Sequence, residues 1–128
     1  MRISKQDVRV QLDIPGATLR QHRGFGTAGD LGGISCEYFT LAAGVDTRPL
    51  FTGLEADACQ CPHWGYVLSG QLTTTDANDV DESVVQGDLF YWPSGHNVRV
   101  DRDAEIIMFS PQEAHSAVIA HMLDKVSA

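Results

Sequence analysis

The hydrophobic pattern predicts a strand near the N-terminus. Apolar side chains alternate with polar ones at Val8, Val10, Leu12 and Ile14, which is the period of a strand with one buried face. A Pro-Gly pair at 15–16 follows directly. Both residues favour turns, so we expect the strand to end there.

Three longer segments follow. Residues 23–33 read RGFGTAGDLGG and contain five glycines, which predicts a loop or a flexible arm across the surface. Residues 34–44 (ISCEYFTLAAG) predict a second strand. Residues 46–58 mix proline, glycine and acidic residues, which predicts a connection rather than a core element.

The second half of the chain alternates short strand patterns with turn residues at nearly even spacing. We expect strands at 59–68, 71–75, 82–86, 88–92, 96–100 and 104–109. The intervening turns are SG, DANDVD, GD, PSG and DRD, which are rich in residues that tolerate turn geometry. This spacing is typical of a β-sandwich or β-barrel and not of alternating strands and helices. The fold class is therefore predicted to be all-β.

One helix is predicted at the C-terminus, over residues 111–126. Ser110 can cap it, Pro111 suits its first position, and Glu113 completes a capping box. Its apolar stripe predicts packing against the barrel or a partner subunit; the stripe contains Ile119, Met122, Leu123 and Val126. His115 and His121 are expected at the surface or edge of this helix.

Composition narrows the function classes. The chain of 128 residues is long enough for one domain with its own core. Its net charge of −8 argues against nucleic acid and anionic membranes as partners. No apolar stretch suits secretion or membrane spanning, so a cytoplasmic location is expected. Three cysteines, an odd number, indicate free thiols rather than disulfides.

Two stretches, CQCPHWGYVLSG at 59–70 and GDLFYWPSGH at 87–96, resemble the paired motifs of the cupin superfamily. In the first, counting back from Gly70 places His63 at the glutamate position of the family. Counting forward from Gly53 places Cys59 and Cys61 at the two positions of its His-x-His pair. The two registers differ by a few residues, and a shortened turn around Pro62 would reconcile them.

The second stretch follows the family pattern at Gly87, Pro93 and Gly95. The histidine is displaced, because His96 comes directly after the glycine and Val98 stands at the usual position. The resemblance covers about the central third of the chain, with core motifs at about 53–100. It implies a jelly-roll cupin barrel forming a single domain over 1–128, a divalent metal inside the barrel, and a homodimer.

The residues themselves favour a metal site of unusual composition. If residues 59–63 are extended, Cys59, Cys61 and His63 lie on one face, and His96 could join them as a fourth ligand. Thiolate and imidazole ligands suit zinc or iron, and we expect zinc, because a thiolate beside an oxygen-activating iron risks oxidation. Four bound ligands would make a closed structural site; three would leave the open position that catalysis requires.

Three functions stay open at this level. The first is a metal-dependent enzyme that acts on a small organic molecule, of isomerase, cyclase or oxygenase type, with Tyr66 or Tyr91 as a proton donor. The second is a metal-free cupin that binds or senses a small molecule. The third is an assembly module that exchanges its Gly-rich arm. The simplest interpretation of the cysteines is core packing, and that of Trp64, Tyr66, Tyr91 and Trp92 is barrel core or interface.

Overall fold

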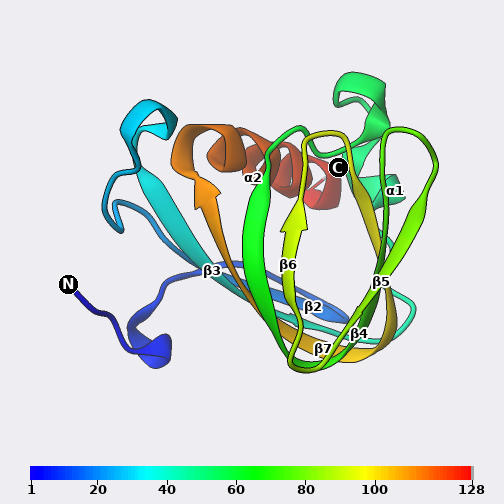
Figure 1. Cartoon of the computed structure of the whole chain (residues 1–128), viewed down its shortest axis with the longest axis horizontal. Coiled ribbons are helices and arrows are strands. Elements are labelled where there is room, and N and C mark those ends of the chain that lie inside the picture. Colours follow the sequence, from blue (N-terminus) through cyan, green and yellow to red (C-terminus); the bar gives the residue numbers. More distant parts are fainter. Residues whose placement is uncertain (128) are drawn as a thin grey trace.

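The computed structural model describes residues 1–127 as a curled, seven-stranded antiparallel sheet with a helix across one end (Figure 1). The strands are β1 (Val10–Ile14), β2 (Ala17–His22), β3 (Ile34–Leu41), β4 (His63–Thr75), β5 (Asp81–Val85), β6 (Leu89–Trp92) and β7 (Asn97–Pro111). The helices are α1 (Arg48–Phe51) and α2 (Gln112–Ser127), with short 3-10 turns at Lys5–Asp7, Gly29–Leu31 and Glu55–Asp57. The strand order is β1-β2-β3-β7-β4-β5. β6 pairs with the first residues of β4, before the part that pairs with β5.

Most predicted strands are found, with one omission. The strand predicted from Val8 to Ile14 is confirmed from Val10 onward, and the one over 34–44 is confirmed as β3. β2 was not predicted; its residues are buried in alternation at Ala17, Leu19 and Gln21. Polar residues occupy the other positions and one of the buried ones, so the hydrophobic pattern is weak there.

Two of the predicted turns are wrong. The chain does not turn back at residues 69–70 or 101–103; β4 and β7 run through them as 13-residue and 15-residue strands. The register between β4 and β7 shifts beside Ser69 and Gln71, so the turn-type residues mark irregularities within continuous strands. These bends let two long strands curve around the core.

Gly70 is required at one of these bends. Its φ is +86°, and a Cβ at this position would lie 2.1 Å from the Asp103 carbonyl oxygen. Gly70→Ala is therefore expected to lower the free energy of unfolding by about 2 kcal/mol, measured by urea denaturation. Gly87 is the matched control, since its φ is +91° but no atom lies near its Cβ position, and Gly87→Ala should lose about 1 kcal/mol. Equal losses would show that the approach to Asp103 is unimportant.

The predicted C-terminal helix is confirmed within a residue at each end, but its cap is not. Ser110 lies inside β7, and its hydroxyl hydrogen-bonds to side chains in the barrel instead of to the helix N-terminus. The helix buries Val118, Ile119 and Met122. It packs on the core with α1 beside it, so the stripe predicted for this helix covers one end of the barrel.

The Gly-rich segment is a loop, as predicted, and it folds back on its own chain. The Phe25 amide donates to the Ile34 carbonyl at 2.7 Å. Gln112, the first residue of α2, accepts at its side chain from the Gly24 amide and donates its own amide to the Gly33 carbonyl. The arm is thus held against the start of the helix.

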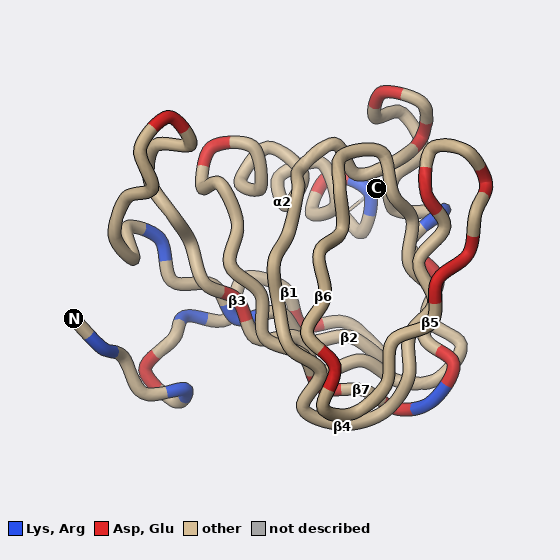
Figure 2. The backbone as a smooth tube through the Cα atoms, in the orientation of Figure 1, with Lys and Arg blue, Asp and Glu red and all other residues tan. Residues whose placement is uncertain are grey.

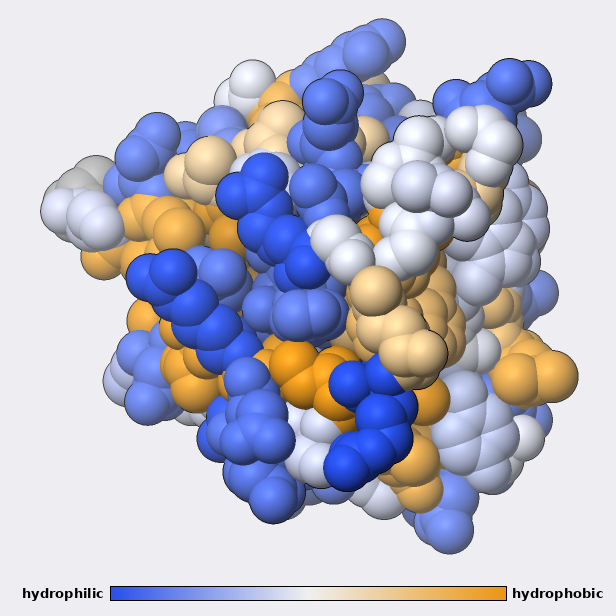
Figure 3. All heavy atoms as spheres, turned by 90° about the vertical axis from the view of Figure 1, so that its left-hand side faces the viewer, coloured by the Kyte–Doolittle hydropathy of each residue, from blue (hydrophilic) through white to orange (hydrophobic). Residues whose placement is uncertain are grey.

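Charged residues lie mainly in loops and at strand ends, while most of the barrel wall is uncharged (Figure 2). The face crossed by the N-terminal segment carries hydrophobic areas between hydrophilic side chains (Figure 3). Ile3 and Phe25 line a small pocket together with Cys36, whose thiol is buried. Among residues 1–127, no helix combines the length and the apolar character needed to cross a bilayer.

Candidate metal centre

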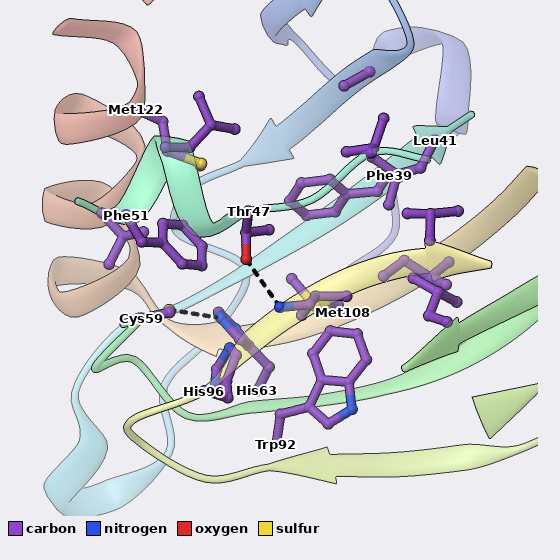
Figure 4. A pocket seen from close by; sticks show the side chains of 18 of the residues that line it. Phe39, Leu41, Thr47, Phe51, Cys59, His63, Trp92, His96, Met108 and Met122 are labelled. Atoms are coloured by element: carbon purple, nitrogen blue, oxygen red, sulfur yellow. Dashed lines mark hydrogen bonds between the residues drawn. The ribbon is translucent and has the colours of Figure 1, made fainter. Parts of the chain in front are cut away.

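Three of the four predicted ligands meet inside the barrel, at the end covered by α2. The Cys59 sulfur and one ring nitrogen from each of His63 and His96 lie within 4.8 Å of one another, and all three residues are buried. Figure 4 shows the three side chains pointing toward one another from separate segments of the chain. The set contains one thiol and two imidazoles, which are ligands for first-row transition metals.

Backbone pairing fixes this convergence. Cys59 and His96 form an isolated antiparallel bridge, in which the Cys59 amide donates to the His96 carbonyl at 2.9 Å and the His96 amide donates to the Cys59 carbonyl at 3.2 Å. His63 is the first residue of β4 and pairs with Trp92 at the end of β6. The turn at 93–96 therefore brings His96 back beside both other residues.

Hydrogen bonds set the tautomer of His63. The Ser110 hydroxyl donates to Glu37 Oε2 at 3.2 Å, and its oxygen lies 2.7 Å from His63 Nδ1. A serine hydroxyl has a single proton, so His63 Nδ1 must be the donor in the second bond. In the neutral ring this leaves Nε2 with a free lone pair, 3.5 Å from the Cys59 sulfur.

His96 is arranged in the same way. Its Nδ1 lies 2.7 Å from the Pro93 carbonyl oxygen, which can only accept, so Nδ1 carries the proton and Nε2 has the lone pair. Metal-bound histidines commonly donate their second ring nitrogen to a carbonyl or carboxylate partner, which orients the ring. Both histidines have such a partner while the metal-facing nitrogen stays available.

A buried carboxylate stands behind the site. Glu37, on β3, has only 1% of its surface exposed. It accepts hydrogen bonds from the Ser35 hydroxyl at 2.7 Å, from Ser110, and from His115 Nδ1 on α2.

His115 was predicted at the surface, and this is wrong: it is 2% exposed, and its ring packs edge-on against His63 at 4.5 Å between centroids. His121 does lie at the surface, where it contacts the Thr52 carbonyl.

Glu37, Ser35 and Ser110 were not predicted as parts of the site. A signal for two of them was present in the predicted strand ISCEYFTL, where Ser35 and Glu37 alternate in phase with Phe39 and so share its inward face. An acidic residue at an inward position of a strand is rare unless it has buried partners.

Cys61 is buried but belongs to another environment. Its sulfur contacts the carbonyl oxygens of Pro62 at 3.4 Å and Pro111 at 3.8 Å, and it is not part of the three-residue cluster. The chain bends at Cys61, so the strict alternation assumed for an extended segment is lost. Burial raises the pKa of the Cys59 thiol to about 12 and also raises that of Cys61, so both are protonated thiols when no metal is bound.

The two site histidines make stability depend on pH. Burial, with the nearby His115 and His96, holds the pKa of His63 well below its ordinary value of 6.5, and burial also lowers the pKa of His96. The unfolded chain therefore binds protons more readily below about pH 6.5. Stability is full above that pH and falls as the pH decreases, by up to about 1.4 kcal/mol per pH unit for each histidine.

Urea unfolding of metal-free protein at several values between pH 7 and pH 5 measures this slope. His96→Gln should reduce it, because glutamine does not titrate. The reverse trend, with stability rising toward acid, would contradict the assignment of neutral, buried rings.

The three donors lie at one end of an internal cavity of about 70 Å³. Apolar side chains from β3, β7, α1 and α2 form much of the rest of its wall, among them Phe39, Met108, Phe51 and Met122 (Figure 4).

Tyr66 and Tyr91, the predicted proton donors, do not line the cavity, and Tyr91 stacks on Trp64 where both are exposed. Trp92 is buried in the wall, as predicted for the barrel core.

Solved structures share this architecture. An oxalate decarboxylase structure from Bacillus subtilis matches with a TM-score of 0.58 and 18% identity, over 84% of this chain and 28% of that one. A variant of the same enzyme matches with a TM-score of 0.61 and 19% identity, over 86% of this chain and 29% of that one. A formate complex of Lactobacillus farciminis oxalate decarboxylase matches with a TM-score of 0.59 and 15% identity, over 84% and 31%. These proteins are cupins. The chain has the cupin fold.

The cupin barrel spans less than a third of the length of these neighbours, and identities this low establish the fold alone. No protein-family model and no curated protein matches the sequence. In the barrel, the second motif forms the whole of β6 and the turn that delivers His96. The first motif delivers Cys59 and His63, so both stretches that carry the resemblance contribute to the same cluster.

Proposed function

We propose that this cupin barrel binds one transition-metal ion through Cys59 Sγ, His63 Nε2 and His96 Nε2. The carrying observation is that both rings are held by their Nδ1 atoms, at Ser110 and at Pro93, which leaves each Nε2 free, and that one ring nitrogen of each histidine lies within 4.8 Å of the Cys59 sulfur. A buried thiol and two buried imidazoles with free lone pairs fit such an ion. Cys61, the fourth predicted ligand, is not among the proposed ligands.

The donor set favours zinc over iron. One thiolate and two imidazoles are a common kind of zinc ligand set, whereas magnesium and calcium prefer oxygen ligands. Three protein ligands leave a further position open toward the cavity, where a bound zinc ion would act as a Lewis acid on a small organic molecule. The structural neighbours are named for a reaction on a small organic acid, which supports a substrate of modest size.

Metal analysis tests this proposal. Protein purified without an affinity tag or chelator, under reducing conditions, is expected to contain close to one equivalent of zinc by elemental analysis. Cys59→Ser and His63→Ala should lose it, because each removes a ligand. Cys61→Ser is the matched control and should retain the metal, since that buried thiol faces Pro62 and Pro111.

Absence of metal in the wild-type protein, with none recovered after addition of Zn²⁺ or Fe²⁺, would refute the proposal. If Cys61→Ser also lost zinc while remaining folded, the proposed set of three ligands would be wrong.

A metal-free ligand-binding barrel is the second candidate. The observation in its favour is the cavity wall, which is almost entirely apolar and resembles a site for a small hydrophobic molecule. This function predicts ligand binding that is unchanged when the metal is removed. The single domain, the homodimer and the cytoplasmic location stay predictions from the sequence.

A further inference from the structure

The barrel interior around the cavity is polar at the end that holds the cluster and apolar at the other end. On β3, the inward positions run from Ser35 and Glu37 to Phe39 and then Leu41. On β7, they run from Ser110 to Met108 and Ile106. Figure 4 shows the histidines and Cys59 at one side of the cavity and Leu41 at the other.

Apart from its histidines, of which His115 is already paired with Glu37, the wall offers no ionic partner for a charged ligand. Among residues 1–127, no lysine, arginine, aspartate or glutamate lines the cavity. Within the described part of the chain, Thr47 is the only hydroxyl residue in the lining, and its Oγ1 already pairs with Asn97 and with the Val98 amide. An anionic group placed against the apolar part of this wall would lose its hydration without compensation.

The proposed metal site can balance one negative charge. A divalent ion bound by the Cys59 thiolate and two neutral imidazoles carries a net charge of +1, so one anionic oxygen donor makes the centre neutral. A second anionic group on the same ligand would have to lie among apolar side chains. Glu37, which hydrogen-bonds to His115 and Ser110, is itself an acid and does not attract a second anionic group.

We propose that the cavity selects a small molecule with a single oxygen-donor head, carrying at most one negative charge, and a short apolar chain, and that it rejects dicarboxylates. The assignment of the head group rests on the proposed metal site, whereas that of the apolar chain rests on the cavity wall alone. The substrate class therefore differs from that of the structural neighbours, which are named for oxalate.

Cavity size limits the length of the chain. A cavity of about 150 Å³ takes up benzene, and this one measures about 70 Å³, so before any side chain moves it fits only a molecule smaller than benzene, such as acetate. Met108 and Met122 line it, and methionine side chains adapt to their neighbours. Acids from acetate up to 2-methylpropanoate are the expected range, and the larger ones require these methionines to move.

Calorimetric titration of zinc-loaded protein tests the charge argument. The probes are 2-methylpropanoate and oxalate, which have the same number of non-hydrogen atoms but carry one and two charges. Oxalate is expected to bind at least about tenfold more weakly. Because oxalate also binds free zinc, the zinc that remains on the protein is measured after each titration. Oxalate binding as tightly as the monoacid, with the zinc retained, would overturn the inference.

Met122→Ala separates charge from size. Removal of this side chain enlarges the cavity without touching a proposed ligand, so 2-methylpropanoate should bind about tenfold more tightly than to the wild-type protein, while oxalate stays weak. Leu89→Ala is the control, because Leu89 is 83% exposed on β6, and it should change neither affinity. A gain for oxalate in Met122→Ala equal to that of the monoacid would show that size alone excluded it.

The outcome distinguishes this inference from the metal proposal. If the protein binds no zinc, the metal proposal fails and the head-group assignment falls with it. The wall assignment then still predicts that neutral 2-methylpropan-1-ol raises the melting temperature of the metal-free protein more than oxalate does at equal concentration. No difference between the two would overturn that part as well.

Discussion

Glu37→Ala is expected to lower the free energy of unfolding by about 3–5 kcal/mol, the usual effect of removing one partner from a buried charged network. Ser35, Ser110 and His115 all donate to this carboxylate, and each would be left without an acceptor in the interior. An unsatisfied buried donor costs about 1–3 kcal/mol. Urea denaturation at pH 7, followed by circular dichroism, measures the change.

Two further variants separate the buried network from charge removal in general. Glu105→Ala removes a carboxylate whose partner is Lys5, in an ion pair at the surface, and it should cost at most about 1 kcal/mol. Glu37→Gln keeps the shape but replaces one acceptor oxygen with a donor, so it should fall between the two. If Glu37→Ala were as stable as the wild-type protein, the network would not stabilise the fold.

The fold could be predicted from the sequence where local patterns and tertiary structure agree. The alternation in β1 and the even spacing of strand patterns after residue 59 both reflect a barrel with an inner and an outer face. The errors arose where the same residue types serve two purposes. Gly70 and the run 101–103 suit turns, but here they bend continuous strands, and only their pairing across the barrel decides between these outcomes.

The candidate site could be predicted only in part for a related reason. Cys59, His63 and His96 lie in two short motifs, so their spacing along the chain was informative. Cys61 fitted the same spacing, but the chain bends at this residue and its thiol faces Pro111 instead. Local spacing cannot report a contact with Pro111, which comes 50 residues later.

The residues that contact the proposed ligands were not predicted, because each also fits a local structural role. Ser110 suits a helix cap, and His115 lies in the first turn of an amphipathic helix, so both had sufficient local explanations. Their real partner, Glu37, is separated from them by 73 and 78 positions in the sequence. Only the closure of the barrel, with β3 pairing along β7, brings these groups together.

Ser110→Ala is expected to weaken zinc binding by about 10–100-fold, although every proposed ligand remains. The hydroxyl accepts from His63 Nδ1 and so holds the ring with Nε2 toward Cys59. Without it, His63 can rotate or take the other tautomer, and metal binding must then restore the correct arrangement. Competition with a chromogenic zinc chelator at pH 7 measures the affinity.

Ser35→Ala is the matched control, because Ser35 is equally buried and also donates to Glu37, but no hydrogen bond connects it to His63. Both variants should lose similar stability, since each removes one donor to the same carboxylate. Only Ser110→Ala should lose zinc affinity, and Ser110→Thr should restore most of it by returning a hydroxyl. If the two alanine variants weakened zinc binding equally, the effect would come from general loosening of the barrel, and the orienting role of Ser110 would be wrong.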